Sequence, residues 1–311
     1  SFSAQISGLR SLFEASYFDP YFLDSQYILS ADLFRTETDY PQFTRRSLGG
    51  DINLGYHLTD DVMVNAGYAN EHVQVEQGAA TQGPTSNLFN SGVTSALRFS
   101  ATWDRRDNRL FPSRGFMHFA QAEVAPAFLG GDLNFIRYTA YSRFYVPLPI
   151  LGLVFKTNAT VGYIQRLSTK PLPISELYYL GGINSVRGYF LRSLSPAQLQ
   201  PITYDPSAPV ALAYVGGNKQ AILNVELEAP LFEKVGLRGV IFYDAGNAYS
   251  EGEPFFHPAD TRLPLGLFHS VGFGFRWFSP IGPLRFEWGI PLNPRPGDQI
   301  PLFEFTIGNF F

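Results

Sequence analysis

The chain has 311 residues, of which 45% are hydrophobic, 16% aromatic and only 16% charged, with a formal net charge of −4. The absence of Cys excludes disulfides and thiolate metal sites, and a net negative charge gives no reason to expect a nucleic-acid partner. No run approaches 18 consecutive apolar residues, so the sequence does not predict a helical membrane protein.

The many aromatic residues and the low charge point instead to strands in a membrane. A soluble domain carries about a quarter charged residues, whereas this chain combines 29 Phe and 17 Tyr with a mean hydropathy of −0.04. Each strand of a transmembrane β-barrel turns one face to lipid and the other to the lumen, and this alternation gives a mean near zero. We therefore predict an all-β fold, a transmembrane antiparallel β-barrel.

Fourteen segments show the period-two alternation of a strand. Their spacing leaves room for turns between membrane strands of about 9–11 residues. No heptad, linker or composition shift marks a second domain, so residues 1–311 are predicted to form one barrel domain. The predicted strands are residues 3–8, 11–18, 25–37, 44–58, 61–76, 92–103, 115–125, 132–146, 152–167, 219–229, 236–245, 271–277, 284–290 and 303–310.

A mixed-charge cluster follows the strand predicted at 92–103. Asp104, Arg106 and Asp107 lie beside a turn, together with two further arginines. One interpretation is a solvated end of a strand. The alternative is an ion network that supports the lumen and the long connector further along the chain.

One connector, residues 168–218, is far longer than the others, contains six Pro and shows no strand periodicity. Loops of this length are usually functional or disordered. It carries the segment GGINSVRGY, in which Arg187 lies between Val186 and Gly188 and is followed by Tyr189. A buried arginine needs a carboxylate partner, because an unpaired charge removed from water costs several kcal/mol.

The next two predicted strands offer such carboxylates. Strand alternation places Asp244 on one face with Phe242, and Glu226 on the polar face of its own strand. If the apolar faces meet lipid, both carboxylates point into the lumen. A planar guanidinium can engage two carboxylates at once, so we hypothesise that Arg187 bonds Asp244, Glu226 or both. The alternative is that residues 244–247 form only a turn and that Arg187 is a solvated loop residue.

The C-terminal strands show the clearest alternation. In residues 271–277 the odd positions are apolar and the even positions are Gly, Gly and Arg, and residues 284–290 and 303–310 repeat the scheme. Strands of a soluble sandwich alternate as well. The number of strands and the aromatic content favour a barrel in a membrane.

The sequence predicts neither an enzyme nor a metal site. The five histidines are scattered, with no i, i+4 pair that would suit a metal. No G-x-S-x-G, Walker-type or G-x-G-x-x-G motif occurs. We therefore expect no catalytic residue and no cofactor.

Three ordered blocks stand out along the chain. Each is weak alone, but their order and spacing together form a specific pattern that ends in an aromatic C-terminal strand. The blocks are TWDRRDN (102–108) with FPSRG (111–115), YYLGG (178–182) running into VRGY (186–189), and NVEL (224–227) followed by FYDAGN (242–247).

These blocks resemble the barrel of the BamA-type outer-membrane insertase superfamily, which includes bacterial surface antigens, organellar Sam and Toc channels, TamA and two-partner secretion transporters. The resemblance covers nearly the whole chain, from about the third strand of the family barrel. It implies a norm of sixteen strands, of which about fourteen are visible here, with the loop 168–218 folded into the lumen. The POTRA domains and first strands expected in the family are absent from this chain, so we expect it to be a fragment of a longer protein.

The resemblance also implies a function. It suggests an outer-membrane assembly factor that inserts and folds β-barrel proteins through a lateral seam between its first and last strands. Its partners would be the lipid bilayer, unfolded outer-membrane β-barrel clients and periplasmic or lipoprotein accessory subunits, in the outer membrane of a Gram-negative cell or of an organelle. The seam residues of the last strand would be Phe303, Phe305, Ile307, Gly308, Phe310 and Phe311.

Three other functions remain open at this point. A two-partner-secretion-type pore that passes an unfolded polypeptide shares the arginine loop and the aspartate strand. The barrel could also anchor a larger secreted fusion protein whose enzymatic part lies upstream. A passive porin would have a constriction loop, but it gives no reason for the three blocks.

Overall fold

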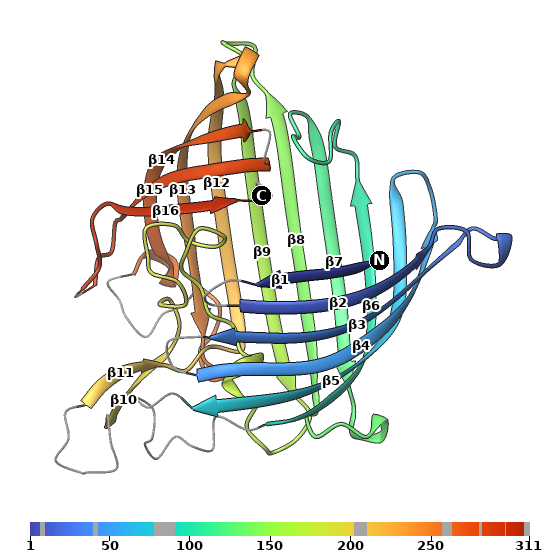
Figure 1. Ribbon diagram of the computed structural model, residues 1–311. Helices are drawn as coiled ribbons and strands as arrows, with labels where there is room; N and C mark the ends of the chain where they lie inside the picture. Colours follow the sequence, from blue (N-terminus) through green and yellow to red (C-terminus); the bar gives the residue numbers. More distant parts are fainter. Residues whose placement is uncertain are drawn as a thin grey trace.

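The computed structural model describes residues 1–6, 10–39, 43–77, 91–201, 210–256, 263–279, 282–295 and 297–307. Fourteen strands form one antiparallel sheet in which every strand pairs with its neighbour in the chain, except that β9 pairs with β12 across the long connector. Figure 1 shows this sheet curling around the connector. The fourteen strands are β1 (Phe2–Ile6), β2 (Arg10–Asp19), β3 (Tyr27–Asp39), β4 (Phe43–His57), β5 (Val62–Gln77), β6 (Gly92–Asp104), β7 (Gly115–Ala125), β8 (Phe135–Pro147), β9 (Val154–Arg166), β12 (Lys219–Phe232), β13 (Leu237–Tyr249), β14 (Phe268–Ser279), β15 (Gly282–Pro291) and β16 (Leu302–Ile307).

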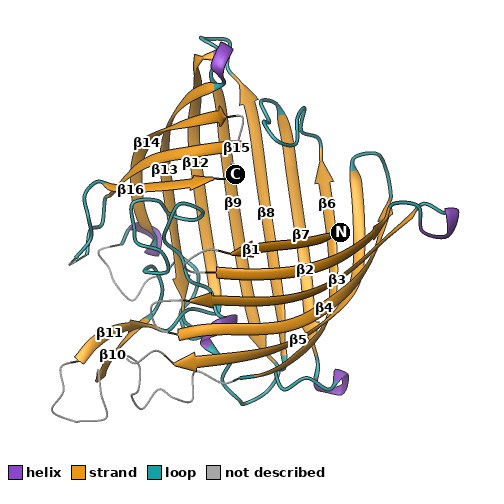
Figure 2. Ribbon diagram, in the orientation of Figure 1, coloured by secondary structure: helices purple, strands orange, loops and turns teal. Residues whose placement is uncertain are grey.

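The two edge strands of the sheet return to the same side of the molecule (Figure 1). Within the described residues, β1 pairs only with β2 and β16 pairs only with β15. Figure 2 shows that, among the residues that the structure describes, helical structure is confined to short turns between strands. These are the single-turn 3-10 helices η1 (Phe22–Asp24), η4 (Ala127–Leu129), η5 (Ile174–Glu176), η6 (Glu233–Val235) and η7 (Pro264–Gly266).

No helix in the described part of the chain is long and apolar enough to cross a membrane.

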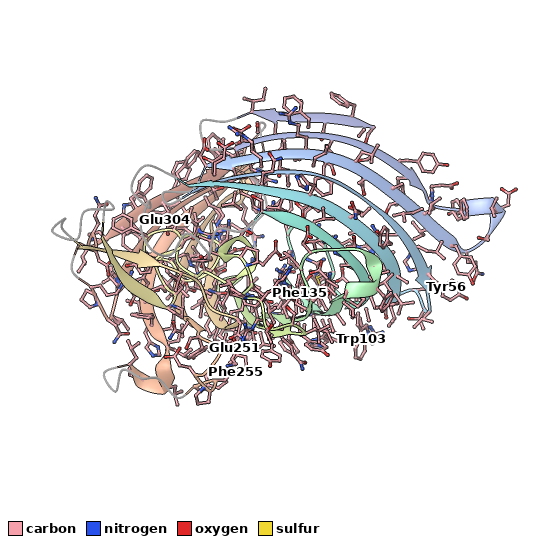
Figure 3. The ribbon with its side chains drawn as sticks, turned by 90° about the horizontal axis from the view of Figure 1, so that it is seen from below. Tyr56, Trp103, Phe135, Glu251, Phe255 and Glu304 are labelled. Carbon is pink, nitrogen blue, oxygen red and sulfur yellow. The ribbon has the colours of Figure 1, made fainter. Side chains whose placement is uncertain are left out.

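The two faces of the sheet differ in chemistry, as the alternation predicts. Large apolar side chains point outward all around the molecule; Leu33, Ile52, Phe99, Ile241 and Phe273 are 46–69% exposed. Aromatic rings of neighbouring strands meet on this face at several places, for example Trp103 with Phe116 and Phe273 with Trp288. In Figure 3 Tyr56 and Trp103 lie at the outer rim of the curved sheet.

The inner face carries the buried polar residues. On β13 the side chains of Val240, Phe242 and Asp244 are at most 5% exposed, whereas Ile241 between them is 58% exposed. The same parity on β12 buries Glu226. The buried charges are therefore on the lumen side, where the connector covers them.

The connector contains more regular structure than the sequence predicts. A two-stranded hairpin, β10 (Ala197–Pro201) and β11 (Val210–Tyr214), lies within the stretch expected to have no strands. Both strands are only five residues long, and one ends in proline, so they lack the extended alternation that marks the wall strands. Figures 1 and 3 both place the part of the connector between η5 and this hairpin inside the curve of the sheet.

The connector packs against the wall through a small apolar core. Leu180, Val186, Tyr189 and Leu194 are fully buried together with Ala248 of β13. Burial of each such side chain contributes about 1.5–3 kcal/mol. Hydrophobic contacts therefore hold the connector alongside its charges.

Glycines permit the closest approach of connector and wall. A Cβ added to Gly289 of β15 would lie 2.3 Å from the backbone nitrogen of Gly188, which itself has a φ of +84°. Only glycine fits both requirements, a positive φ in the connector and an empty wall position opposite it. The two backbones touch at this point.

Candidate functional site

Arg187 is the centre of the site. Its Nε and Nη2 donate to Oδ2 and Oδ1 of Asp244, each at 2.6 Å, and its backbone N–H donates to Oδ2 at 3.0 Å. Its Nη1 donates to Oε1 of Glu226 at 2.6 Å and to Oε2 of Glu287 at 3.1 Å. The structure thus brings together Arg187 with Asp244 and Glu226, and adds a third carboxylate from β15.

The ring of Phe242 completes the surroundings of the guanidinium. The Cζ atom of Arg187 lies 3.5 Å from the centroid of this ring, a cation–π contact. A glycine opposite makes room for the ring, because a Cβ on Gly272 would lie 2.3 Å from an atom of Phe242. The ring and the carboxylate of Asp244 come from the same face of β13, two residues apart.

Strand β12 contacts the connector backbone as well as the side chain of Arg187. Nδ2 of Asn224 donates to the carbonyl oxygen of Ser185 at 2.7 Å and to Oδ1 of Asp244 at 2.8 Å. Residues 244–247 all belong to β13 (Leu237–Tyr249), so the alternative that they form only a turn is wrong. Because they are in a strand, Asp244 is held rigidly at the wall.

Strand β14 supplies a second buried guanidinium. Arg276 contacts Glu226 through Nη1 at 2.8 Å and Nη2 at 2.6 Å, and Oε1 of Glu287 through Nη2 at 2.9 Å. Glu226 and Glu287 are therefore each shared by Arg187 and Arg276. Arg285 of β15 adds a further bond to Glu287, with Nη2 2.8 Å from Oε2.

A fourth wall carboxylate extends the network toward β9. Glu228 accepts bonds from Lys156 at 2.8 Å, from Arg276 at 3.1 Å and from Arg238 at 2.6 Å. Four carboxylates and four cations of this network are at most 5% exposed, so charges are balanced inside the wall. They are Glu226, Glu228, Asp244, Glu287, Lys156, Arg187, Arg276 and Arg285.

The charge on Arg187 is secured by its surroundings. Burial alone would lower the pKa of this guanidinium, but the carboxylates of Asp244 and Glu226 raise the pKa well above its ordinary value. The removal of Asp244 would leave Arg187 with Glu226 and Glu287 only, and the buried network would then hold one more cation than carboxylates, which is strongly destabilising. The pair is therefore a fixed attachment at any pH at which the carboxylates are ionised.

Tyr189 makes a further attachment at the other side of the motif. Its hydroxyl donates to the carbonyl oxygen of His269 at 2.8 Å. Burial raises its pKa to about 12, so the hydroxyl remains a donor at neutral pH. Arg295, in the loop between β15 and β16, donates to the side chain and the carbonyl oxygen of Ser193. The connector is thus attached on both sides of Arg187.

A second ion network holds the beginning of the connector with the opposite polarity. Glu176 of η5 accepts a bond from Nη2 of Arg137 on β8 at 2.7 Å, and Arg137 also contacts Glu123 of β7 at 2.9 Å. Arg98 of β6 contacts the other oxygen of Glu123 at 3.0 Å. Here the wall supplies the cation and the connector supplies the anion.

The mixed-charge cluster at the end of β6 has local contacts. Arg106 binds both oxygens of Asp104 at 2.8 Å, and Asp107 accepts the backbone N–H groups of Ser113 and Arg114. Among the residues that the structure describes, no hydrogen bond or ion pair joins Asp104, Arg106 or Asp107 to the connector. The geometry matches a strand end that closes into a turn.

The turn after this cluster does reach across the molecule through an aromatic contact. The ring of Phe111 lies 4.0 Å, centroid to centroid, from the ring of Phe278 at the end of β14.

The predicted seam residues divide into two groups. Phe303, Phe305 and Ile307 point outward from β16 and are 49–58% exposed. Gly308, Phe310 and Phe311 lie outside the described residues.

Sequence reasoning did not include several charged residues of the site. Arg276, Arg285 and Glu287 could be placed on the lumen face by parity, but nothing in the sequence shows which side chains meet across strands. The register of the sheet sets these neighbours: Glu226 of β12 lies opposite Phe242 of β13, and Glu287 of β15 lies opposite Gly274 of β14. No group of His, Asp and Glu suited to a metal ion occurs in the described part of the chain.

Comparison with known proteins places this geometry in context. A family model described as the Omp85 superfamily domain matches residues 1–311. Among curated relatives, "Outer membrane protein assembly factor BamA" of Nitratidesulfovibrio vulgaris is 28% identical over all of this chain and 38% of its own length. The protein of the same name from Neisseria meningitidis is 27% identical over 95% of this chain and 41% of its own length. This chain therefore spans about two fifths of each of these relatives.

This chain spans a larger share of a relative from Drosophila melanogaster. This SAM50-like protein is 28% identical over 99% of the chain and 67% of its own length.

Solved structures show the same fold. BamA from Haemophilus ducreyi, lacking POTRA domains 1–3, superposes with a TM-score of 0.83 at 21% identity, over 99% of this chain and 63% of that one. CdiB from Acinetobacter baumannii gives a TM-score of 0.60 at 14% identity, over 94% and 49% of the two chains. The prediction of an all-β antiparallel barrel fold is confirmed.

Proposed function

This chain belongs to the Omp85 superfamily, as its three sequence blocks indicated, and from that premise we propose that it is the barrel of an outer-membrane protein assembly factor. In this role it inserts and folds other β-barrel proteins through a lateral seam formed with its last strand. It acts in the outer membrane of a Gram-negative cell, and an equivalent role in an organellar outer membrane is compatible with the SAM50-like relatives.

The observation that carries the proposal is the match along 95–100% of the chain to relatives named as assembly factors, at 27–28% identity. The many exposed large apolar side chains on the outer face support residence in a bilayer, since a soluble monomer rarely exposes an extended apolar surface. The chemistry needs no cofactor, because strand addition uses backbone hydrogen bonds.

In this proposal the connector motif of Val186, Arg187, Gly188 and Tyr189 acts as a lock. Asp244, Glu226 and Phe242 are its partners on the wall. The lock keeps the connector in the lumen and fixes the curvature of β12–β15, the strands that carry the seam strand β16. A rigid wall next to a weakly held last strand would direct opening to the seam.

The proposal extends to parts outside this chain. We propose that residues 1–311 form one barrel domain with the loop 168–218 inserted, preceded in the whole protein by POTRA domains and further strands. Unfolded outer-membrane β-barrel proteins are its clients. Periplasmic or lipoprotein subunits assist it.

Reconstitution tests this function. The whole protein is placed in liposomes, a urea-unfolded outer-membrane barrel is added, and folding is followed by the mobility of unheated client on gels. We expect faster folding than in empty liposomes and in liposomes with the variant Asp244→Asn. With accessory subunits supplied, a folding rate equal to that of empty liposomes would contradict the proposal.

A further inference from the structure

The turn between β8 and β9 is apolar where a turn is ordinarily polar. Residues 146–155, VPLPILGLVF, carry no polar side chain, whereas turns favour Gly, Pro and the short polar residues Asn, Asp and Ser. At the tip of this turn Ile150 is 61% exposed and Leu151 is 83% exposed. Leu151 also has a φ of +54°, a conformation that bulky residues seldom adopt. The turn therefore projects two large apolar side chains away from the rest of the chain.

The turn between β12 and β13 presents further apolar side chains beside the first. Strand β12 pairs with β9, and a Cβ added to Gly152 would lie 3.2 Å from Cγ of Pro230, so the two turns are side by side. Figures 1 and 2 show them together at the top of the view. In the second turn Phe232 is 65% exposed and Val235 is 58% exposed. We call these exposed residues of the two turns the apolar tip: Ile150, Leu151, Phe232 and Val235.

The apolar tip continues the outer face of the wall. Val146 near the end of β8 and Leu231 near the end of β12 are both about half exposed and lead into the two turns. Trp277, on the outer face of β14, donates its indole N–H to the carbonyl oxygen of Val235 at 3.0 Å. Trp is enriched where a membrane meets water, because its ring is apolar and its N–H is polar. This contact places the tip at the level of the membrane–water boundary.

Other turns at the same edge of the sheet are charged. Strands β4, β6 and β8 run in the same direction, so the turns that follow them lie at one edge. Residues 58–61, after β4, include two aspartates, and residues 105–114, after β6, include five charged residues. The long connector leaves the sheet at the opposite edge, after β9. Outer-membrane barrels have their short turns on the periplasmic side, so the apolar tip is assigned to that side.

We infer that the apolar tip inserts into the lipid interface of the periplasmic leaflet. Lipid fits better than a partner protein, because the tip is continuous with the apolar outer face and residues 146–155 offer none of the polar rim that a protein interface normally has. The charged residues of the second turn, Glu233 and Lys234, are exposed and can reach water from an interfacial position. Insertion would fix the depth of the hairpin that carries Glu226 and Asp244. The inference rests on the membrane residence within the proposed function and not on client folding.

Fluorescence quenching at known depths tests the inference without any client. Residues 1–311 contain no Cys, so Leu151→Cys gives one site in the barrel for a nitrobenzoxadiazole label, with any cysteine elsewhere in the whole protein replaced by Ser. The whole protein is placed in phosphatidylcholine liposomes that contain lipids spin-labelled at known depths. We expect the label to lie about 5–10 Å below the lipid surface, the depth of interfacial apolar side chains. Iodide added to the water should quench it only weakly.

Two further labelled variants separate the possible outcomes. Asp60→Cys, in the charged turn at the same edge, is the matched control and should be quenched by iodide and not by lipid. Phe273→Cys, on the outer face of β14, should be quenched by lipid and so reports membrane residence itself. Iodide quenching at position 151 as strong as at 60 would overturn the inference. Protection of position 151 from both quenchers would also overturn it, because protein would then cover the tip. Absence of lipid quenching at position 273 would contradict membrane residence and with it the proposed function, whereas lipid quenching at 273 but not at 151 would overturn this inference alone.

Discussion

At Arg187 the connector supplies the cation and the wall supplies the carboxylates, whereas at Glu176 the connector supplies the anion and Arg137 supplies the cation. The first network is at most 2% exposed at Arg187, Glu226 and Asp244. The second is 10% exposed at Glu176 and 23% at Arg137. Both join the same connector to the same wall, so they differ chiefly in how much water reaches the charges.

This difference sets the expected energies. A buried pair gains little over an apolar replacement, but the loss of one partner strands a charge and costs about 3–5 kcal/mol. A pair that water reaches is screened and contributes closer to about 1 kcal/mol. Loss of any one partner in the buried network should therefore lower the free energy of unfolding strongly. Loss of a partner in the more exposed network should lower it only slightly.

The largest effect is expected for Asp244→Asn. This change removes the carboxylate that takes two bonds from the guanidinium of Arg187 and one from its backbone. We expect the free energy of unfolding to fall by about 3–5 kcal/mol. Urea titration of the protein in detergent, with folding read from gel mobility without heating, measures it. A loss below about 1 kcal/mol would place this network in the same class as the wetter one.

A smaller effect is expected where the connector backbone touches the wall. In Gly289→Ala the new Cβ would lie 2.3 Å from the nitrogen of Gly188, so the backbone must shift, at a cost of about 1–3 kcal/mol. Gly239→Ala on β13 is the control, because its nearest neighbour is a movable Leu231 side-chain atom at 3.1 Å. Protease cleavage within 168–218 should become faster in the first variant only. Equal cleavage in both would show that this contact does not position the connector.

The smallest effects are expected at the charges that water reaches. Glu176→Gln should cost about 1 kcal/mol, and the cost should shrink as salt is added. Arg105→Ala breaks the exposed pair with Asp61, at 58% and 39% exposure, and should change stability by less than about 0.5 kcal/mol. The urea midpoint at low and high salt compares the two. A cost for Glu176→Gln as large as that for Asp244→Asn would remove the distinction between the networks.

The sequence contained most of the fold. Alternation located all fourteen wall strands, because apolar side chains recur at every second position on the outward face, while many of the inward positions are small or polar. The hairpin of β10 and β11 escaped prediction, since a five-residue strand that ends in Pro201 gives too little periodicity to recognise. Parity alone also placed Glu226 and Asp244 on the lumen side.

The rest of the site depends on register and curvature, which the sequence does not state. Arg276 of β14 meets Glu226 of β12 although β13 lies between these two strands in the sheet. The bond between Glu176 and Arg137 requires the connector to pass back beneath β8. Both contacts join residues that no local pattern relates.

The central claim is that Arg187 and Asp244 hold the connector in the lumen as one energetic unit. A double-mutant cycle with Arg187→Met and Asp244→Asn measures it, using the free energy of unfolding of the four proteins. We predict a coupling free energy of at least about 2 kcal/mol, with the double variant more stable than the sum of the single losses implies. Additive losses, within about 0.5 kcal/mol, would contradict the account.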